Sequence, residues 1–142
     1  MPTVQRFEDL EVWKEARELV KQVYRLTTKF PNHETFGLTS QLRRAAVSVM
    51  SNIAEGFERG ANTEFLQFLF VARASCGEVR SQLYIAIDLN YAPQMEIEEI
   101  RKQCEKLSRR IKALIDYLKQ SNIKGHKFRE EQVDYQIEQP ET

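Results

Sequence analysis

Histidine, glycine, proline and cysteine are all scarce in this chain of 142 residues. Its two histidines, His33 and His126, cannot supply the Glu-x-x-His pairs on facing helices that bundle di-metal centres use. The sequence also lacks a glycine-rich phosphate loop and a nucleophile elbow. Five glycines and four prolines leave few positions for turns, which favours long helices. The sequence therefore indicates a helical protein that is not an enzyme and holds no metal or cofactor.

The two cysteines, Cys76 and Cys104, both lie in apolar helical surroundings. We interpret them as buried, reduced thiols rather than as a disulfide or redox pair. The N-terminal residues lack a hydrophobic signal core, and no apolar run reaches the roughly 18 residues of a membrane span. These features predict a cytoplasmic protein that does not associate with a membrane.

Charge is balanced over the whole chain but unevenly distributed along it. The formal net charge is zero, which argues against a globally basic nucleic-acid binder. Between residues 101 and 129, however, ten Lys and Arg residues stand against two acids, and residues 130–142 contain five acids and no base. The pattern predicts a basic face and an acidic tail, consistent either with autoinhibition or with improved solubility.

Apolar spacing predicts four helices, over residues 9–28, 38–58, 63–89 and from 93 or 94 to about 120. Asp9 and Asn62 are the expected N-caps, and a helical turn is expected over 32–36. In the last helix the apolar residues alternate steps of three and four without a gap: Ile97, Ile100, Cys104, Leu107, Ile111, Leu114 and Leu118. We predict an all-α protein, an antiparallel four-helix bundle over residues 9–120, with an N-terminal arm (1–8) and a flexible charged tail (121–142).

The first and third predicted helices differ in how apolar they are. The inward face of the first is expected to consist of Leu10, Trp13, Val20, Val23, Tyr24 and Thr27. The third is apolar almost all round, and we interpret Phe65, Phe68 and Phe70 as packing residues. Such a helix needs more than one neighbour, which predicts self-association; the alternative is a helix at the centre of a monomeric bundle.

Polar residues recur at helical spacing along the two middle helices. If residues 59–62 form a tight turn, Ser48 faces Val71 and Arg44 comes within one turn of Glu78. Because buried polar groups are costly unless paired, we expect these residues to fix the register of the two helices. The predicted structural polar seam consists of Gln41, Arg44, Ser48, Asn52, Glu55, Ser75 and Glu78.

Residues 38–48 (LTSQLRRAAVS) and 51–56 (SNIAEG), with Phe7–Leu10, Trp13 and 65–78 around them, are more specific than helical spacing requires. This combination resembles the four-helix-bundle family of 23S rRNA intervening-sequence proteins. The resemblance implies an up-down bundle that assembles into a ring, a homopentamer, in bacteria, with no established enzymatic activity. More distantly, the chain is similar to the accessory protein of diversity-generating retroelements, which engages reverse transcriptase and nucleic acid. Met50 and Ala74 depart from the proline and glycine common in the family.

Seven basic residues are candidates for contact with RNA or DNA: Arg43, Arg59, Arg73, Arg80, Lys102, Arg109 and Arg110. Repeated around a ring, such residues would sum into a positive band, whereas the ordinary alternative is a solvated surface balanced by acids. Two further functions stay open. One is a protein–protein adaptor that binds a reverse transcriptase or another protein; the less favoured is a magnesium-dependent nucleotide hydrolase that uses carboxylates such as Glu55 and Glu58 inside the bundle.

Overall fold

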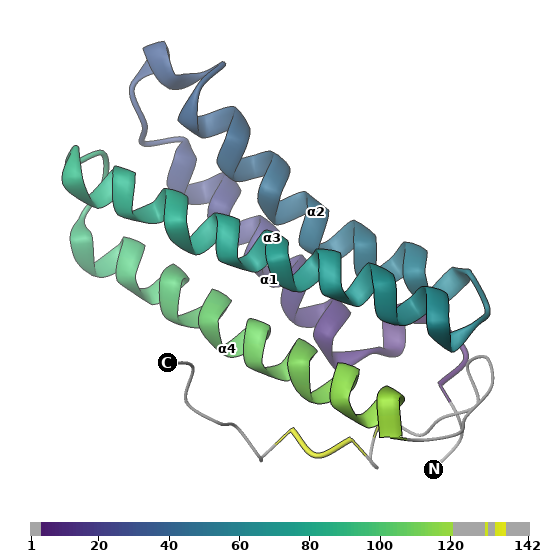
Figure 1. Ribbon diagram of the computed structural model, residues 1–142. Helices are drawn as coiled ribbons and strands as arrows, with labels where there is room; N and C mark the ends of the chain where they lie inside the picture. Colours follow the sequence, from purple (N-terminus) through teal and green to yellow (C-terminus); the bar gives the residue numbers. More distant parts are fainter. Residues whose placement is uncertain (1–3, 121–129, 131–132, 136–142) are drawn as a thin grey trace.

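A computed structural model describes residues 4–120, 130 and 133–135. This part of the chain contains no strand and four α-helices: α1 (Glu11–Thr27), α2 (Leu38–Glu58), α3 (Asn62–Asp88) and α4 (Gln94–Gln120) (Figure 1). Two short 3-10 turns, η1 (Phe7–Asp9) and η2 (Asn32–Glu34), precede α1 and α2. The all-α class with four helices is thus confirmed. Within the described range, no helix combines the length and the apolar character that a bilayer span requires.

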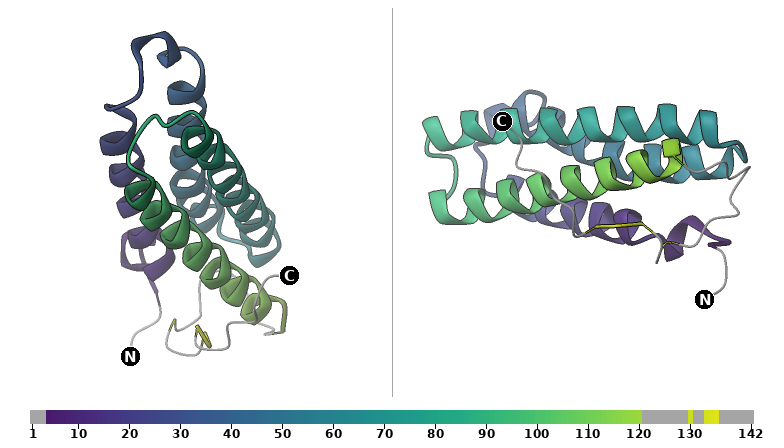
Figure 2. Two further views of the ribbon diagram at one scale, coloured as in Figure 1. Left: turned by 90° about the vertical axis from the view of Figure 1, so that its left-hand side faces the viewer. Right: turned by 60° about the horizontal axis from the view of Figure 1, so that its bottom comes forward.

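The four helices lie side by side around one interior (Figure 2). Each helix packs against its neighbours in the chain, and α4 also packs against α1. Ion pairs give the relative direction of α1 and α4: Glu15 bonds Arg110, whereas Lys29, just beyond α1, bonds Glu96 near the start of α4. These two helices therefore run antiparallel.

Helix α1 turns an apolar stripe toward the interior at steps of three and four residues. Its buried side chains are Val12, Trp13, Ala16, Leu19, Val23, Leu26 and Thr27. The predicted inward face is right for Trp13 but wrong for Tyr24, which is 41% exposed because it lies off the stripe, beside Arg43. The predicted Asp9 cap is also wrong, since Asp9 ends η1 and Leu10 occupies the cap position.

Helices α2 and α3 are joined by a short turn and approach closely beside it. Gly60 adopts a left-handed conformation with φ of 86°, which permits the sharp reversal. One turn earlier, a Cβ atom on Gly56 would lie 2.5 Å from Cβ of Phe68 and 3.1 Å from Cδ1 of Phe65. A hydrogen is all that fits at Gly56, so this contact aligns the two helices.

The register of α2 against α3 is one turn away from the predicted one. Ser48 and Ser75 share a hydrogen bond with 2.9 Å between their hydroxyl oxygens, whereas the prediction sets Val71 opposite Ser48. Farther from the turn, Gln82 donates to the side-chain oxygen of Gln41 at 3.3 Å. The close contact between Gly56 and Phe68, next to the turn, sets this alignment, and the polar pairs farther along the helices follow from it.

Helix α4 buries every residue of its predicted apolar seam, each at most 4% exposed. The thiol of Cys104 donates to the backbone carbonyl of Cys76 at 3.2 Å, and both cysteines are free and buried, as predicted. The hydrogen bond with Cys104 and burial raise the pKa of the Cys76 thiol far above its ordinary value. The thiol is therefore neutral and a poor nucleophile.

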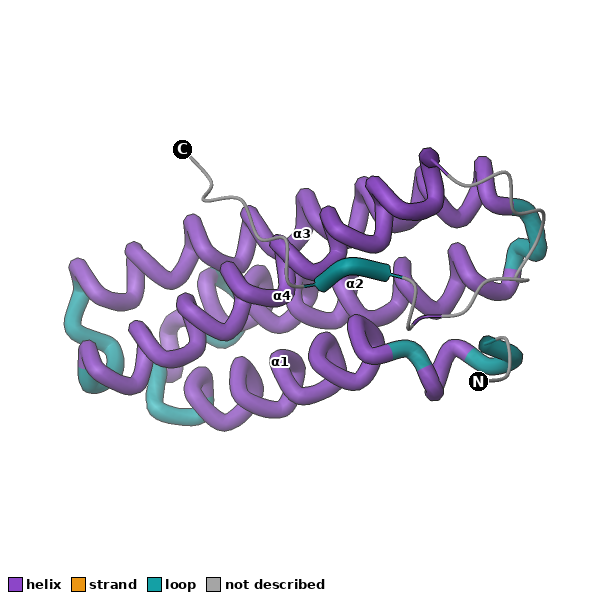
Figure 3. Tube along the Cα trace, turned by 90° about the horizontal axis from the view of Figure 1, so that it is seen from below, coloured by secondary structure: helices purple, strands orange, loops and turns teal. Residues whose placement is uncertain are grey.

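The described C-terminal residues cover the start of α1 (Figure 3). Both carboxylate oxygens of Glu130 accept a hydrogen bond from the backbone N–H of Glu11, at 3.2 and 2.9 Å, at the positive end of the helix. Tyr135 donates its hydroxyl proton to the same carboxylate at 2.9 Å, and Val133 is buried. The rest of the tail predicted over 121–142 lies outside the described residues.

Candidate nucleic-acid interface

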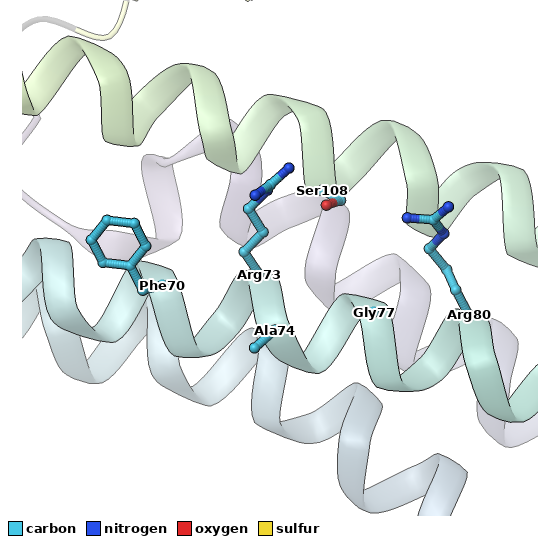
Figure 4. Close-up of a pocket in the computed structure, with 6 residues that line it drawn as sticks. All are labelled: Phe70, Arg73, Ala74, Gly77, Arg80 and Ser108. Atoms are coloured by element: carbon cyan, nitrogen blue, oxygen red, sulfur yellow. The ribbon is translucent and has the colours of Figure 1, made fainter. Parts of the chain in front are cut away.

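A shallow cleft of about 310 Å³ lies between α3 and α4. Its lining residues are Phe70, Arg73, Ala74, Gly77, Arg80 and Ser108 (Figure 4). The close-up shows Arg73 and Arg80 reaching from α3 toward α4 on either side of Ser108. Between the two arginines the cleft is lined by the small residues Ala74 and Gly77, which fill little of it. A Cβ on Gly77 would meet nothing within 4 Å. The cleft is therefore open to a ligand from outside.

The cleft is the centre of a longer surface that follows one edge of α3. Phe70, Arg73, Gly77, Arg80 and Tyr84 succeed one another at steps of three and four, which places them along the same side of the helix. We call this edge, with the α4 residues that face it, the α3–α4 groove. The α4 residues of the groove are Arg101, Glu105, Ser108, Arg109 and Lys119.

Among the described residues of the α3–α4 groove, basic side chains outnumber acidic ones. The carboxylate of Glu105 lies 3.0, 3.0 and 3.7 Å from the guanidinium groups of Arg101, Arg109 and Arg80, respectively. A second carboxylate, Glu98, bonds Arg101 at 3.1 Å, and this hydrogen bond lowers the pKa of Glu98. In these ion pairs between described residues, two carboxylates bond three guanidinium groups, so basic side chains are concentrated at this point of the groove.

Aromatic rings stand at both ends of the groove. Phe70 is 47% exposed, and the ammonium of Lys119 lies 5.0 Å from its ring centroid. Tyr84 is 50% exposed, with the guanidinium carbon of Arg101 5.9 Å from its centroid. Phe70 is therefore not a core residue of the single chain, and its packing at an interface between copies stays a prediction. Each ring has a cation close by.

The seven basic residues predicted to contact nucleic acid separate into three groups. Arg73, Arg80 and Arg109 come together in the groove. Lys102 is exposed on α4 outside it. The remaining three are held by neighbours elsewhere in the bundle: Arg43, Arg59 and Arg110. Arg43 donates to the hydroxyl of Thr27 at 2.8 Å, Arg110 bonds Glu15 at 2.7 Å, and Arg59 lies 3.6 Å from Glu55.

Sequence reasoning places Tyr84 beside Arg73 and Arg80 but missed Arg101 and Lys119 as parts of this surface. One signal was present: the stripe from Phe70 to Tyr84 has helical spacing but contains no aliphatic side chain. The apolar character of α3 as a whole concealed it. The α4 residues carry no comparable signal, because their position depends on the register between α3 and α4.

The predicted polar seam between α2 and α3 is in part a hydrogen-bonded network. The Asn52 amide donates to the backbone carbonyl and the hydroxyl oxygen of Ser48, at 2.7 and 2.9 Å, and Ser48 in turn bonds Ser75. Gln82 donates to Glu78 at 3.1 Å and to Gln41 of α2 at 3.3 Å. These bonds satisfy polar groups between two closely packed helices.

The buried ion pair predicted between Arg44 and Glu78 is absent from the described part of the chain. Both side chains are exposed, and Glu78 instead accepts a hydrogen bond from Gln82. The outward position of both residues on their helices explains the difference. Glu55 and Glu58 are exposed too, so these carboxylates do not meet inside the bundle as a magnesium site would require.

The outer side of α2 and α3 forms a second surface, which we call the α2–α3 face. Its apolar members are Val47, Val71 and Ile85, which are 36%, 49% and 45% exposed. Arg44 and Glu78 supply opposite charges on the same face. A surface with exposed aliphatic groups and both signs of charge suits protein contact better than contact with phosphates.

The sequence profile of the 23S rRNA-intervening sequence proteins matches residues 8–113, which include α1, α2, α3 and most of α4. The chain belongs to this family. The predicted resemblance is thereby confirmed, and the described C-terminal residues that cap α1 lie beyond the matched range. Similarity to the accessory protein of diversity-generating retroelements stays a prediction. The comparison with curated proteins finds no match.

A solved structure is similar to the helical bundle of this chain. It is a protein of unknown function from the S23 ribosomal protein family of Bacteroides thetaiotaomicron. The TM-score is 0.66 at 19% sequence identity, and the similarity covers 73% of this chain and 97% of the other. At this level of identity the comparison establishes a shared fold.

Proposed function

We propose that the protein is a non-enzymatic nucleic-acid-binding protein that acts as an oligomer. The observation that carries the proposal is the α3–α4 groove, where Arg73, Arg80, Arg101 and Arg109 gather around one cleft between two helices. Phosphate contacts made by Arg and Lys supply most of the affinity of sequence-independent binding. A groove of this charge on a chain of zero net charge concentrates that attraction at one place.

We propose further that copies associate through the α2–α3 face into a ring of up-down bundles, a pentamer as the family resemblance implies. Exposed Val71 and Ile85 support this, since burial between copies would remove their apolar surface from water. Arg44 and Glu78 are exposed on this face, and we expect their opposite charges to pair between copies. Each added subunit would bring another groove, which raises the avidity for a long nucleic acid.

The binding test compares variants that remove two charges inside or outside the groove. Arg73→Gln/Arg80→Gln removes groove charges, and Lys102→Gln/Lys106→Gln removes two exposed charges from the outer side of α4 as the matched control. Fluorescence anisotropy with labelled RNA and DNA at several salt concentrations measures affinity. We expect the groove variant to bind at least tenfold more weakly and to lower the salt slope by about 1.4 to 1.8 for two lost phosphate contacts.

The control variant should lose less than threefold in affinity. Equal losses of affinity in the two variants would mean that nucleic acid is attracted by the overall charge of the protein and not by the α3–α4 groove. Absence of any binding at low ionic strength would overturn the nucleic-acid proposal and favour the adaptor, whose partner is a protein such as a reverse transcriptase. Light scattering at micromolar concentration tests the ring, because a mass of one folded chain would contradict it.

A further inference from the structure

Along the α3 edge of the groove, aromatic and basic residues follow one another in a sequence that phosphate binding alone does not require. An aromatic residue stands at each end, at Phe70 and Tyr84, and the arginines Arg73 and Arg80 lie between them. The two rings are fourteen residues apart, which corresponds to about 21 Å along a helix. Both rings are about half exposed beside a cation rather than covered by the core.

We propose that the α3–α4 groove selects single-stranded nucleic acid, with Phe70 and Tyr84 as stacking platforms for bases and Arg73 and Arg80 as phosphate contacts between them. This inference rests on the proposed function and specifies the class of nucleic acid. Single-strand binding sites combine a positive groove that follows the backbone with aromatic side chains on which bases stack. The groove has both features on adjacent turns of one helix.

A duplex would make poorer use of this surface. Its bases are stacked on one another, so their faces are closed to a protein ring, and its exterior presents phosphates and sugars. An exposed phenylalanine such as Phe70 gains little from a phosphate, whereas an unpaired base covers the ring and removes apolar surface from water. The cations beside the rings, Lys119 and Arg101, can then contact the phosphate of the nucleotide whose base is stacked.

The length of the groove sets the length of strand that it binds. At the roughly 3.4 Å rise of a stacked strand, about six nucleotides span the interval between the two rings, and fewer do so if the strand is extended. Affinity should therefore rise with oligonucleotide length up to about six nucleotides for one groove. Longer strands gain only by reaching a second subunit.

The experiment measures anisotropy of labelled dT15, U15 and a 15-base-pair duplex with the full-length chain. Phe70→Leu/Tyr84→Leu keeps apolar bulk but removes both rings; Phe36→Leu/Tyr24→Leu, at one exposed phenylalanine and one exposed tyrosine elsewhere, is the matched control. We expect the parent protein to bind the single strands at least tenfold more tightly than the duplex. The groove variant should lose at least tenfold for dT15 and U15 and less than threefold for the duplex, while the control variant stays unchanged.

A third variant, Phe70→Trp, keeps a ring at the end of the groove and adds a fluorescent reporter, since the native Trp13 is only 8% exposed. It should bind dT15 as the parent does, with its emission quenched by the single strand but not by the duplex. Equal losses for single strand and duplex in the leucine variant, or a lack of quenching, would overturn the single-strand inference. If Arg73→Gln/Arg80→Gln still weakened duplex binding in that case, the proposed function itself would stand. Thermal melts and light scattering of each variant establish that fold and assembly are retained.

Discussion

The two sides of α3 meet their neighbouring helices in different ways. On the side of α2, small residues and closed polar pairs bring the helices together, as at Gly56 and between Ser48 and Ser75. On the side of α4, the outer edge carries long cations and exposed rings, with Arg80 and Tyr84 as examples. One helix therefore serves both as a tightly fitted structural element and as one wall of an open groove.

The difference lies in the kind of polar group on each side of α3 and in how openly it lies. Between α2 and α3 the hydroxyl and amide groups bond one another, so little capacity for a ligand is left there. Between α3 and α4 three guanidinium groups gather around the carboxylate of Glu105, beside an open cleft. The comparison predicts that substitutions on the first side change stability, whereas those on the second change binding.

The largest expected change in stability comes from adding a methyl group at a glycine of the α2–α3 contact, and the same change at a glycine of the groove serves as the comparison. Gly56→Ala should destabilise the fold by about 2–3 kcal/mol, because the new Cβ would lie 2.5 Å from Cβ of Phe68 and neither atom can move without shifting a helix. Gly77→Ala, on the groove side, has open space and should stabilise the helix by up to about 1 kcal/mol. Urea unfolding followed by circular dichroism measures both.

The same two variants also test whether α3 is tightly packed on the α2 side and open on the α4 side. If Gly77→Ala were as destabilising as Gly56→Ala, the groove floor would be packed in solution and not open. If Gly56→Ala were neutral, close approach of α2 and α3 would not determine their alignment.

A smaller effect is expected from the polar network. Ser75→Ala should destabilise the protein by about 1 kcal/mol, because Ser48 loses a buried hydrogen-bond partner. Ser81→Ala, at an exposed position of the same helix, is the control and should be neutral or slightly stabilising. A double-mutant cycle with Ser48→Ala measures the coupling, and a coupling near zero would show that the hydroxyl pair does not stabilise the α2–α3 contact.

The fold is predictable from the sequence where one periodic pattern decides it. Helix α4 has an uninterrupted apolar seam, and every residue of that seam is buried. The bounds of α2 are as predicted, with Gly37 directly before its first residue and the turn at Gly60 just after its last. The register of α2 and α3 is one turn off, because it depends on the fit of Gly56 against Phe68, a contact in three dimensions that spacing does not encode.

The candidate site is less predictable, for a related reason. Spacing identifies Arg73 and Arg80 as neighbours on α3, but it does not tell whether a ring at position 70 faces a core, a partner or solvent. That depends on the angle at which α4 crosses. Likewise, spacing assigns Arg44 to a polar seam, and only the orientation of α2 in the structure shows that Arg44 is exposed.

A weaker, pH-dependent effect is expected at the end of the α2–α3 pair distant from the turn. Glu34 accepts hydrogen bonds from the Leu38 backbone N–H at 2.9 Å and from the Tyr91 hydroxyl at 2.7 Å, and these bonds lower its pKa. The ionised carboxylate is thus favoured by folding. Its contribution is complete above the ordinary value of 4.5 and is lost as pH falls through the lowered pKa.

We therefore expect Glu34→Gln to be less stable than the parent at pH 7, with the difference shrinking as pH falls below 4.5, through the lowered pKa of Glu34. Glu99→Gln, at an exposed carboxylate of α4, is the control and should follow the parent over the whole range. Urea midpoints between pH 3 and 7 provide the measurement. A difference that grew toward acid pH would mean that Glu34 is not bonded as its carboxylate.

The smallest change in the free energy of unfolding is expected for a substitution at Arg44. The buried ion pair predicted from the sequence would instead make this change one of the largest. Arg44 is exposed, so Arg44→Ala should change the free energy of unfolding by no more than about 0.5 kcal/mol. If the α2–α3 face joins subunits, the same variant should nevertheless lower the assembly mass in light scattering, because Arg44 and Glu78 then pair between copies. Arg25→Ala, at an exposed arginine of α1, should change neither quantity. A loss of several kcal/mol in the folded single chain would contradict the outward position of Arg44, and an unchanged mass would remove this residue from the subunit contact.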